Sequence, residues 1–236
     1  MNRITPLDAQ SHALLRFNRK AAGATRQIIQ LGLSEIAFAA ADMPLCLAKD
    51  AHTGKFNLIA LLGLVRSTNL FSIDGRFQAT YVPHAAMLTG FRIHDEGDAG
   101  LAIDPIDSSI GNEGEPLFMN GHPTPMLGRL RETLEKVMAD IGAAQTLIDR
   151  YAAKRLLRPL RLSVHTGDGR DHDIAGLYTV DEPALQHLPD NDVVALHRTD
   201  ALAPLAILSS SLAQIERLRQ LHNIRFQPEI TNYSLR

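Results

Sequence analysis

Hydrophobic and polar residues alternate with two different periods along this chain, and each period predicts a different kind of element. Between Arg161 and Glu182 apolar residues recur at every second position, which is typical of β-strands. After Thr124 they recur at every third or fourth position, which is typical of an α-helix. Helical patterns return in the C-terminal third. We therefore expect an α+β fold, in which an antiparallel sheet of hairpins or a meander packs with helices.

The segment 161–182 is predicted to form a hairpin at Asp168-Gly169, because this dipeptide reaches the positive φ values of a two-residue type I′ turn at low steric cost. Counting outward from that turn pairs His165 with His172. Directly opposed residues have Cβ atoms about 4.5–5.5 Å apart, so both imidazoles can reach one cation. Alternation places them with Ile174 on a mixed face. The apolar face is predicted to hold Leu160, Leu162, Val164, Ala175 and Leu177.

Two interpretations of the histidine pair remain open. The first is a solvated or half-buried contact between neighbouring strands. The second is a metal site in which His165 and His172 bind a divalent metal, as in non-haem iron enzymes that add a third ligand and keep positions open. Asp171 and Asp173 are both predicted to point away from the pair, so the third ligand must come from elsewhere. The candidates for it are His84, His94 and His197.

A second hairpin is expected at Asp74-Gly75. A two-residue loop would place Phe71 and Ile73 opposite polar residues, whereas a three-residue loop with a bulge aligns the apolar residues on one face. We expect the bulged form.

Thr124 as cap and Pro125 in the first turn predict the start of the longest helix. Its apolar or small positions alternate by three and four, which is typical of a coiled-coil seam and would support a homodimer. Met138 and Leu147 widen this stripe, and Gly142 costs about 1 kcal/mol in a helix interior. These features favour a core helix, or a helix pair broken near Gly142, over a dimer seam.

Charge and composition predict how the chain is divided. Residues 1–30 carry five basic residues and one acidic residue, so a flexible basic arm is expected. Residues 31–225 are predicted to form a single α+β domain. Within it, residues 95–123 combine carboxylates with glycines and prolines, and we expect a solvated loop that serves as a lid or an interaction segment. Residues 226–236 are predicted to form a polar tail.

Composition also argues against several classes of function. A net charge of -2 disfavours a nucleic-acid binder that neutralises phosphates. No apolar run reaches the length of about 18 residues that a transmembrane helix needs, and no secretory signal is recognised, so we expect a cytoplasmic protein. The single cysteine, Cys46, lies in an apolar run and is predicted to be buried. Neither a dinucleotide fingerprint, a P-loop nor a nucleophile elbow occurs, so no cofactor is expected.

Seven segments occur in an order and spacing typical of one bacterial family. They are Phe56–Leu64 with ALLGL, NLF at 69–71, Tyr81-Val82-Pro83, EGEPLF at 113–118, the helix after Thr124, GLYTVDE at 176–182, and ALAP at 201–204. Over roughly residues 34–221 the chain resembles the SapC family. It departs from the family after the Tyr-x-Pro element, where relatives tend to carry arginines and Pro-Phe but residues 84–91 read HAAMLTGF.

The resemblance implies an accessory role, because the family is named after surface-layer proteins and some members are encoded near flavin-dependent halogenases and outer-membrane receptors. It supplies no shared set of catalytic residues. We expect a non-catalytic protein that binds a partner protein, a peptide or a small ligand in peptide or small-molecule uptake or modification, through the acidic loop and the mixed hairpin face. The alternative is a metal-dependent, oxygenase-like enzyme that uses His165 and His172. A structural surface-layer component fits poorly, since no signal sequence is recognised.

Overall fold

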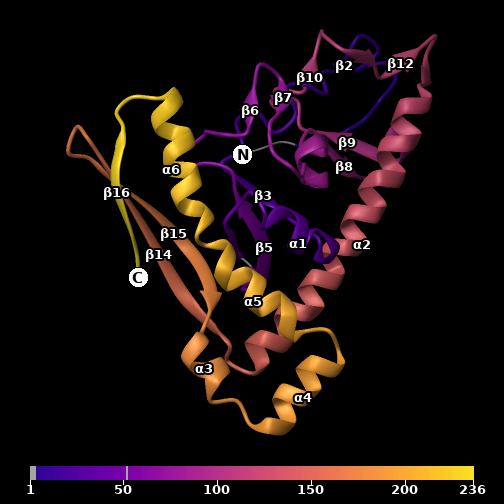
Figure 1. Ribbon diagram of the computed structural model, residues 1–236. Helices are drawn as coiled ribbons and strands as arrows, with labels where there is room; N and C mark the ends of the chain where they lie inside the picture. Colours follow the sequence, from indigo (N-terminus) through magenta and orange to yellow (C-terminus); the bar gives the residue numbers. More distant parts are fainter. Residues whose placement is uncertain (1–3, 52) are drawn as a thin grey trace. The chain divides into compact units, whose positions relative to one another are not determined.

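The computed structural model describes residues 4–51 and 53–236, and their contacts divide the chain into two units. Unit 1 contains residues 4–25, Phe71–Gln78 and Pro83–Ala139. Unit 2 contains Arg26–Leu70, Ala79–Val82 and Asp140–Arg236 (Figure 1). Each unit is assembled from three separate segments of the chain.

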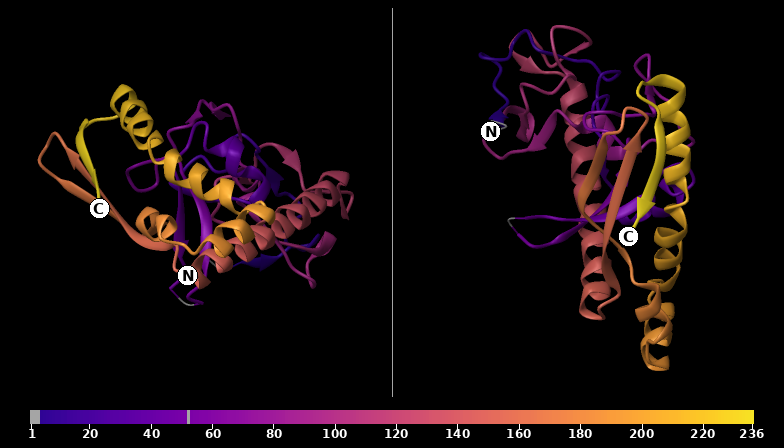
Figure 2. Two further views of the ribbon diagram at one scale, coloured as in Figure 1. Left: turned by 60° about the horizontal axis from the view of Figure 1, so that its bottom comes forward. Right: turned by 90° about the vertical axis from the view of Figure 1, so that its left-hand side faces the viewer.

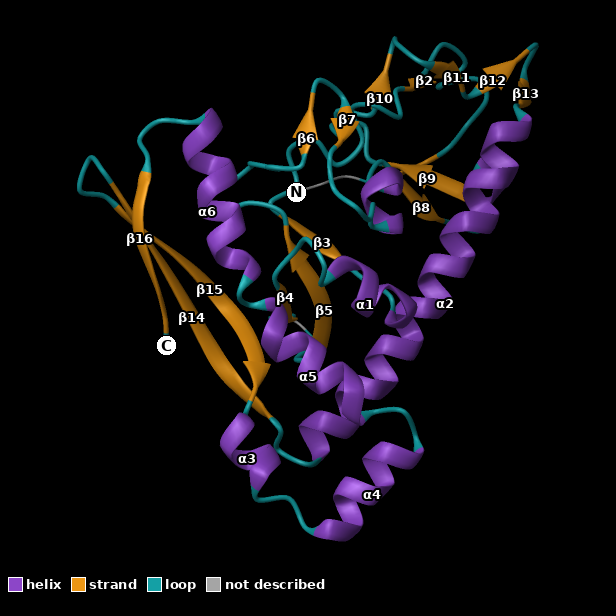
Figure 3. Ribbon diagram, in the orientation of Figure 1, coloured by secondary structure: helices purple, strands orange, loops and turns teal. Residues whose placement is uncertain are grey.

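Unit 2 is built on a six-stranded sheet with the strand order β16-β14-β15-β4-β5-β3, and each neighbouring pair is antiparallel (Figure 3). This sheet and the helices packed on it confirm the predicted α+β class. Its strands are β3 (Ile28–Gln30), β4 (Leu45–Lys49), β5 (Phe56–Leu61), β14 (Leu157–Thr166), β15 (Asp171–Val180) and β16 (Ile230–Leu235).

The central strands β4 and β5 are apolar at consecutive positions because both of their faces are buried. Leu45, Cys46 and Leu47 are each at most 1% exposed. Burial raises the pKa of the Cys46 thiol to about 12, so the thiol stays protonated. The prediction that Cys46 is buried is confirmed.

Helices of unit 2 cover this sheet. Helix α5 contacts β15 and β4, and α6 runs beside β16 (Figure 2). The Ser211 hydroxyl, at the end of α5, accepts a hydrogen bond of 2.9 Å from the Leu45 N–H and so fixes this helix to the start of β4. The helices are η1 (Leu33–Glu35), α1 (Ile36–Ala39), α3 (Glu182–Gln186), α4 (Asp190–Arg198), α5 (Leu202–Ser211) and α6 (Gln214–Arg225).

Unit 1 consists of small sheets around an apolar core. In this core the rings of Phe17 and Phe91 pack edge to face, with their centroids 5.0 Å apart. Its β6–β7 hairpin turns through a two-residue loop with Ile73 opposite Arg76, so the predicted bulged form is wrong. The elements are β1 (Thr5–Pro6), β2 (Arg16–Phe17), β6 (Ser72–Ile73), β7 (Arg76–Phe77), η2 (His84–Leu88), β8 (Phe91–Ile93), η3 (Asp98–Gly100), β9 (Leu101–Ile103), β10 (Ile110–Gly111), β11 (Glu115–Pro116), β12 (Phe118–Met119) and β13 (His122–Pro123).

Three segments carry more structure than their composition predicted. The expected basic arm contains β1, β2 and β3 and buries Leu7 and Phe17, while its residues 1–3 lie outside the described part. The expected acidic loop forms β9 to β13. Its Asp107 carboxylate is buried, and it accepts hydrogen bonds from the N–H and the hydroxyl of Ser109 at 3.0 and 2.7 Å. The expected polar tail forms β16.

The long helix α2 (Pro125–Ala153) begins where Thr124-Pro125 predicted and continues without interruption through Gly142. The alternative of a helix pair broken near Gly142 is therefore wrong. Leu127 and Tyr151 on its apolar stripe are fully buried, as expected of a core helix. Within the described part of the chain, α2 and the other helices fall short of the length and hydropathy that crossing a membrane requires.

Candidate functional site

The β14–β15 hairpin closes through a three-residue loop, not through the predicted two-residue turn. The N–H of Thr166 donates to the Arg170 carbonyl at 2.9 Å, and the N–H of Gly169 donates to the Thr166 carbonyl at 2.9 Å. Gly169 has a φ of 82°, whereas Asp168 does not have positive φ. This geometry is a type I turn followed by a left-handed glycine.

The longer loop shifts the pairing of the two strands by one residue. His165 lies opposite Asp171, and His172 lies opposite Val164. The prediction that His165 and His172 are directly opposed is therefore wrong, because a shift of one residue turns one of the two side chains to the other face of the sheet. Ile174 likewise lies opposite Leu162 and is buried on the apolar side.

The face that carries His165 is polar, and its groups pair with one another. His165 Nδ1 lies 2.7 Å from Asp171 Oδ1, and the Ser163 hydroxyl donates to Asp173 Oδ1 at 2.6 Å. The side chains of His165 and Asp171 are 38% and 67% exposed, so this pair lies open to solvent. It is a solvated contact between strands.

The metal hypothesis was based on directly opposed His165 and His172, and the strand register does not place them opposite each other. Of the candidate third ligands, His84 and His94 belong to unit 1, and His197 lies in α4 of unit 2. Over residues 4–51 and 53–236, no three or more His, Cys, Asp or Glu side chains are grouped so that they could hold a metal ion.

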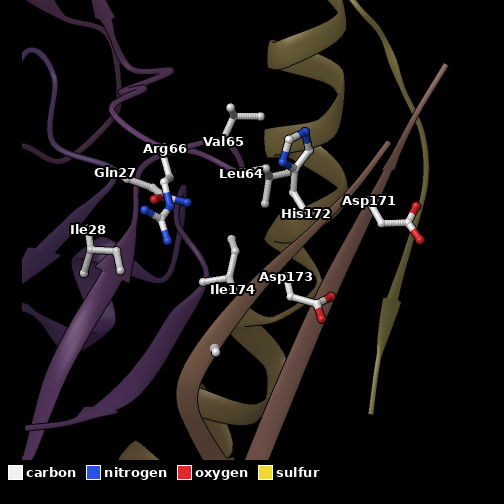
Figure 4. A pocket seen from close by; sticks show the side chains of 10 residues that line it. Gln27, Ile28, Leu64, Val65, Arg66, Asp171, His172, Asp173 and Ile174 are labelled. Atoms are coloured by element: carbon white, nitrogen blue, oxygen red, sulfur yellow. The ribbon is translucent and has the colours of Figure 1, made fainter. Parts of the chain in front are cut away.

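The opposite face of β15 lines a pocket of about 560 Å³. The pocket lies in unit 2, between the first half of β15 and the segments at the start of β3 and after β5 (Figure 4). Its lining residues are Gln27, Ile28, Leu64, Val65, Arg66, Asp171, His172, Asp173, Ile174 and Ala175.

The pocket forms because β15 joins the rest of the sheet only in its second half. Its pairing with β4 is confined to Leu177 and Tyr178. Just before them, Gly176 has a φ of 76°, next to a register shift in the pairing with β14. A bulge of this kind bends a strand and increases its twist, so residues 171–175 diverge from β4 and β5 (Figure 3).

The pocket combines an apolar wall with a few polar groups. Gln27 and Arg66 lie on one side and His172 on the other, with aliphatic side chains between them (Figure 4). Asp171 and Asp173 contribute to the lining, but their carboxylates point away from the cavity (Figure 4). Among the described lining residues, Arg66 is therefore the one whose permanently charged group faces the cavity.

A buried histidine of α6 lies near this pocket. His222 is 5% exposed, its Nε2 is 3.3 Å from the Pro228 carbonyl, and its Nδ1 has no hydrogen-bond partner among the described residues. Burial lowers the pKa of His222, and this effect outweighs the contact with the Pro228 carbonyl, which raises it. Because a carbonyl oxygen can only accept, His222 Nε2 is assigned as the donor to Pro228.

Two further buried carboxylates of unit 2 have a structural role. Glu35 accepts a hydrogen bond of 2.9 Å from the Tyr81 hydroxyl, and burial raises the Tyr81 pKa. Asp42 accepts from the N–H of Thr80 and pairs with Arg217 at 2.6 Å. The segment around Tyr81 is thus fixed to the segment around α1, and these carboxylates serve as anchors.

Sequence reasoning singled out His172 for a metal that the geometry does not support, and it missed Gln27 and Arg66. Both lie far from His172 in the sequence and reach the pocket because β3 pairs with β5. The one available signal was the position of Arg66 directly after a long apolar run.

Comparison with known proteins gives one match. The family model described as SapC matches residues 7–218 of the 236-residue chain. No curated protein and no solved structure matches.

Proposed function

The chain belongs to the SapC family, and we propose that it is a non-catalytic binding protein that holds a small ligand in the pocket beside β15. The observation that carries this proposal is the pocket itself. Its volume of about 560 Å³ falls within the range of about 300–1,000 Å³ that is typical of small-molecule sites. Such sites combine an apolar lining with a few polar groups that fix orientation, as Arg66 and His172 would do here.

The proposal favours this pocket over the other face of the hairpin, which the sequence offered as a binding surface. On that face His165 and Ser163 already use their hydrogen-bonding groups on Asp171 and Asp173. A partner would have to break these pairs before it gained new ones. The pocket face presents Arg66 and His172 without such internal partners among the described residues. A ligand can therefore bind there without that cost, which suits an accessory role in uptake or modification of a small molecule.

Titration with the neutral dye Nile red tests this function, because its fluorescence rises in an apolar site. We expect saturable binding to the wild-type chain. The half-buried Val65 lines the pocket, so Val65→Trp should weaken binding about tenfold or more by filling the cavity.

Val194→Trp is the matched control, since Val194 is exposed on α4 outside the pocket. Circular dichroism and thermal unfolding confirm that both variants fold. Binding that is not saturable, or that Val65→Trp leaves unchanged, would contradict the proposal.

A further inference from the structure

We infer that the ligand of this pocket is an aliphatic carboxylate, whose carboxylate binds Arg66 and whose chain lies on the apolar wall. The inference rests on the proposed function and names its ligand class. It depends on three properties of the cavity. These are a guanidinium that has no carboxylate partner, acidic side chains that point away from the cavity, and an aliphatic wall.

The guanidinium of Arg66 is available to a ligand. Arg66 is exposed at the pocket, and within residues 4–51 and 53–236 no carboxylate is paired with it. A guanidinium presents donors in a planar fork that matches a carboxylate in a bidentate arrangement. Three other arginines of unit 2 differ in this respect, because each is paired with a carboxylate, namely Arg170 with Asp168, Arg217 with Asp42, and Arg219 with Glu216.

The acidic residues of the lining do not oppose an anion. Asp171 and Asp173 direct their carboxylates to the other face of β15, where they pair with His165 and Ser163. The groups that remain toward the cavity are a guanidinium, an imidazole and the amide of Gln27. The guanidinium of Arg66 is the permanent positive charge among these groups, and one such charge complements the single negative charge of a carboxylate better than the double charge of a phosphate.

The remaining wall suits an aliphatic chain. Leu64 and Ile174 lie between Arg66 and His172, Ile28 lies beyond Arg66, and all three present branched aliphatic surface; no Phe, Tyr or Trp lines the pocket among the described residues. Each methylene that leaves water for such a wall strengthens binding about fourfold. Affinity should therefore rise along the series hexanoate, octanoate and decanoate until the cavity is filled.

Displacement of Nile red by three ligands that share one chain tests the inference, each below its micelle-forming concentration. The ligands are decanoate, decanol and decyltrimethylammonium. We expect decanoate to bind about tenfold more tightly than decanol, since a charge-assisted hydrogen bond distinguishes them. The cationic ligand should bind most weakly.

Arg66→Gln should remove the preference of decanoate over decanol while dye binding persists. Arg161→Gln is the matched control, because Arg161 is an exposed arginine of β14 that does not line the pocket. Equal affinity for decanoate and decanol, or a preference that survives Arg66→Gln, would overturn the carboxylate assignment and leave the pocket as a binding site. If neither the dye nor any of the three ligands binds, the proposed function fails as well.

Discussion

The β6–β7 and β14–β15 hairpins both turn at Asp-Gly, but through loops of different length. In β6–β7, Asp74 and Gly75 have positive φ values of 50° and 70°, and the strands pair directly on either side of them. This is the two-residue type I′ geometry. In β14–β15, Gly169 alone of the dipeptide has a positive φ, of 82°, and the loop includes Gly167 as a third residue.

The difference lies in what the aspartate side chain contacts. The Asp168 carboxylate accepts a hydrogen bond of 2.6 Å from the Thr166 hydroxyl, another of 2.6 Å from Arg170 Nε, and one of 3.3 Å from the Arg170 N–H. Aspartate contacts of this local kind favour a type I turn. No comparable bond to Asp74 is found in the described part of the chain. The dipeptide thus indicates where a chain turns, and its neighbours decide the loop length.

The largest effect expected from a test of this comparison comes from the two glycines. Gly75→Ala and Gly169→Ala should each destabilise the protein by about 1–2 kcal/mol, because a Cβ is strained at positive φ. Gly75→Ala should cost more, since its Cβ would also lie 3.0 Å from the Lys20 Cβ, whereas the position at Gly169 is open. Urea unfolding followed by circular dichroism measures both. If Gly169→Ala had the same urea midpoint as the wild type, this would argue against a positive φ at Gly169.

A smaller effect is expected from the aspartates. Asp168→Asn removes the charge that binds Arg170 and should loosen the loop, whereas Asp74→Asn should have little effect because asparagine tolerates positive φ. Hydrogen exchange of the Thr166 and Gly169 amides reports on the loop directly. Exchange that is equally fast in both variants and the wild type would show that the carboxylate does not control this turn.

The smallest expected effect is a loss of hairpin stability at low pH. The side chains of Arg170 and Thr166 lower the pKa of Asp168 to about 2 from its ordinary 3.8. Because the folded-state pKa is depressed, the ionised carboxylate stabilises the hairpin above pH 3.8, and this contribution is lost as the pH falls toward 2. NMR titration of the carboxyl carbon checks the value, and Arg170→Gln should raise it. An unchanged pKa in that variant would contradict the pairing.

Elements with a strong local signal were predictable from the sequence. The burial of Cys46 and the start of α2 at Pro125 agree with their predictions, because an apolar run and a Thr-Pro cap act over a few residues. Both Asp-Gly turns were located, but each was assigned the loop of the other. The choice depends on side-chain hydrogen bonds, as at Asp168, that an apolar-polar pattern does not contain.

The candidate site was much less predictable. His172 was named for its expected partner His165, from which the structure separates it, and Arg66 was not named at all. The pocket depends on the bend at Gly176 and on the pairing of β3 with β5. It brings Arg66 and His172 to one cavity although they lie about a hundred positions apart in the sequence. Such long-range placement has no signature in local periodicity.

The odd number of residues in the β14–β15 loop also decides which charge a ligand would meet. If an insertion or deletion of one residue shifted the pairing while β14 kept its place, β15 would present its other set of side chains. Asp171 and Asp173 would then enter the cavity beside Arg66, and His172 and Ile174 would leave it. A change of one codon in a surface loop can thus exchange an anion-binding pocket for an acidic one without any substitution in its walls.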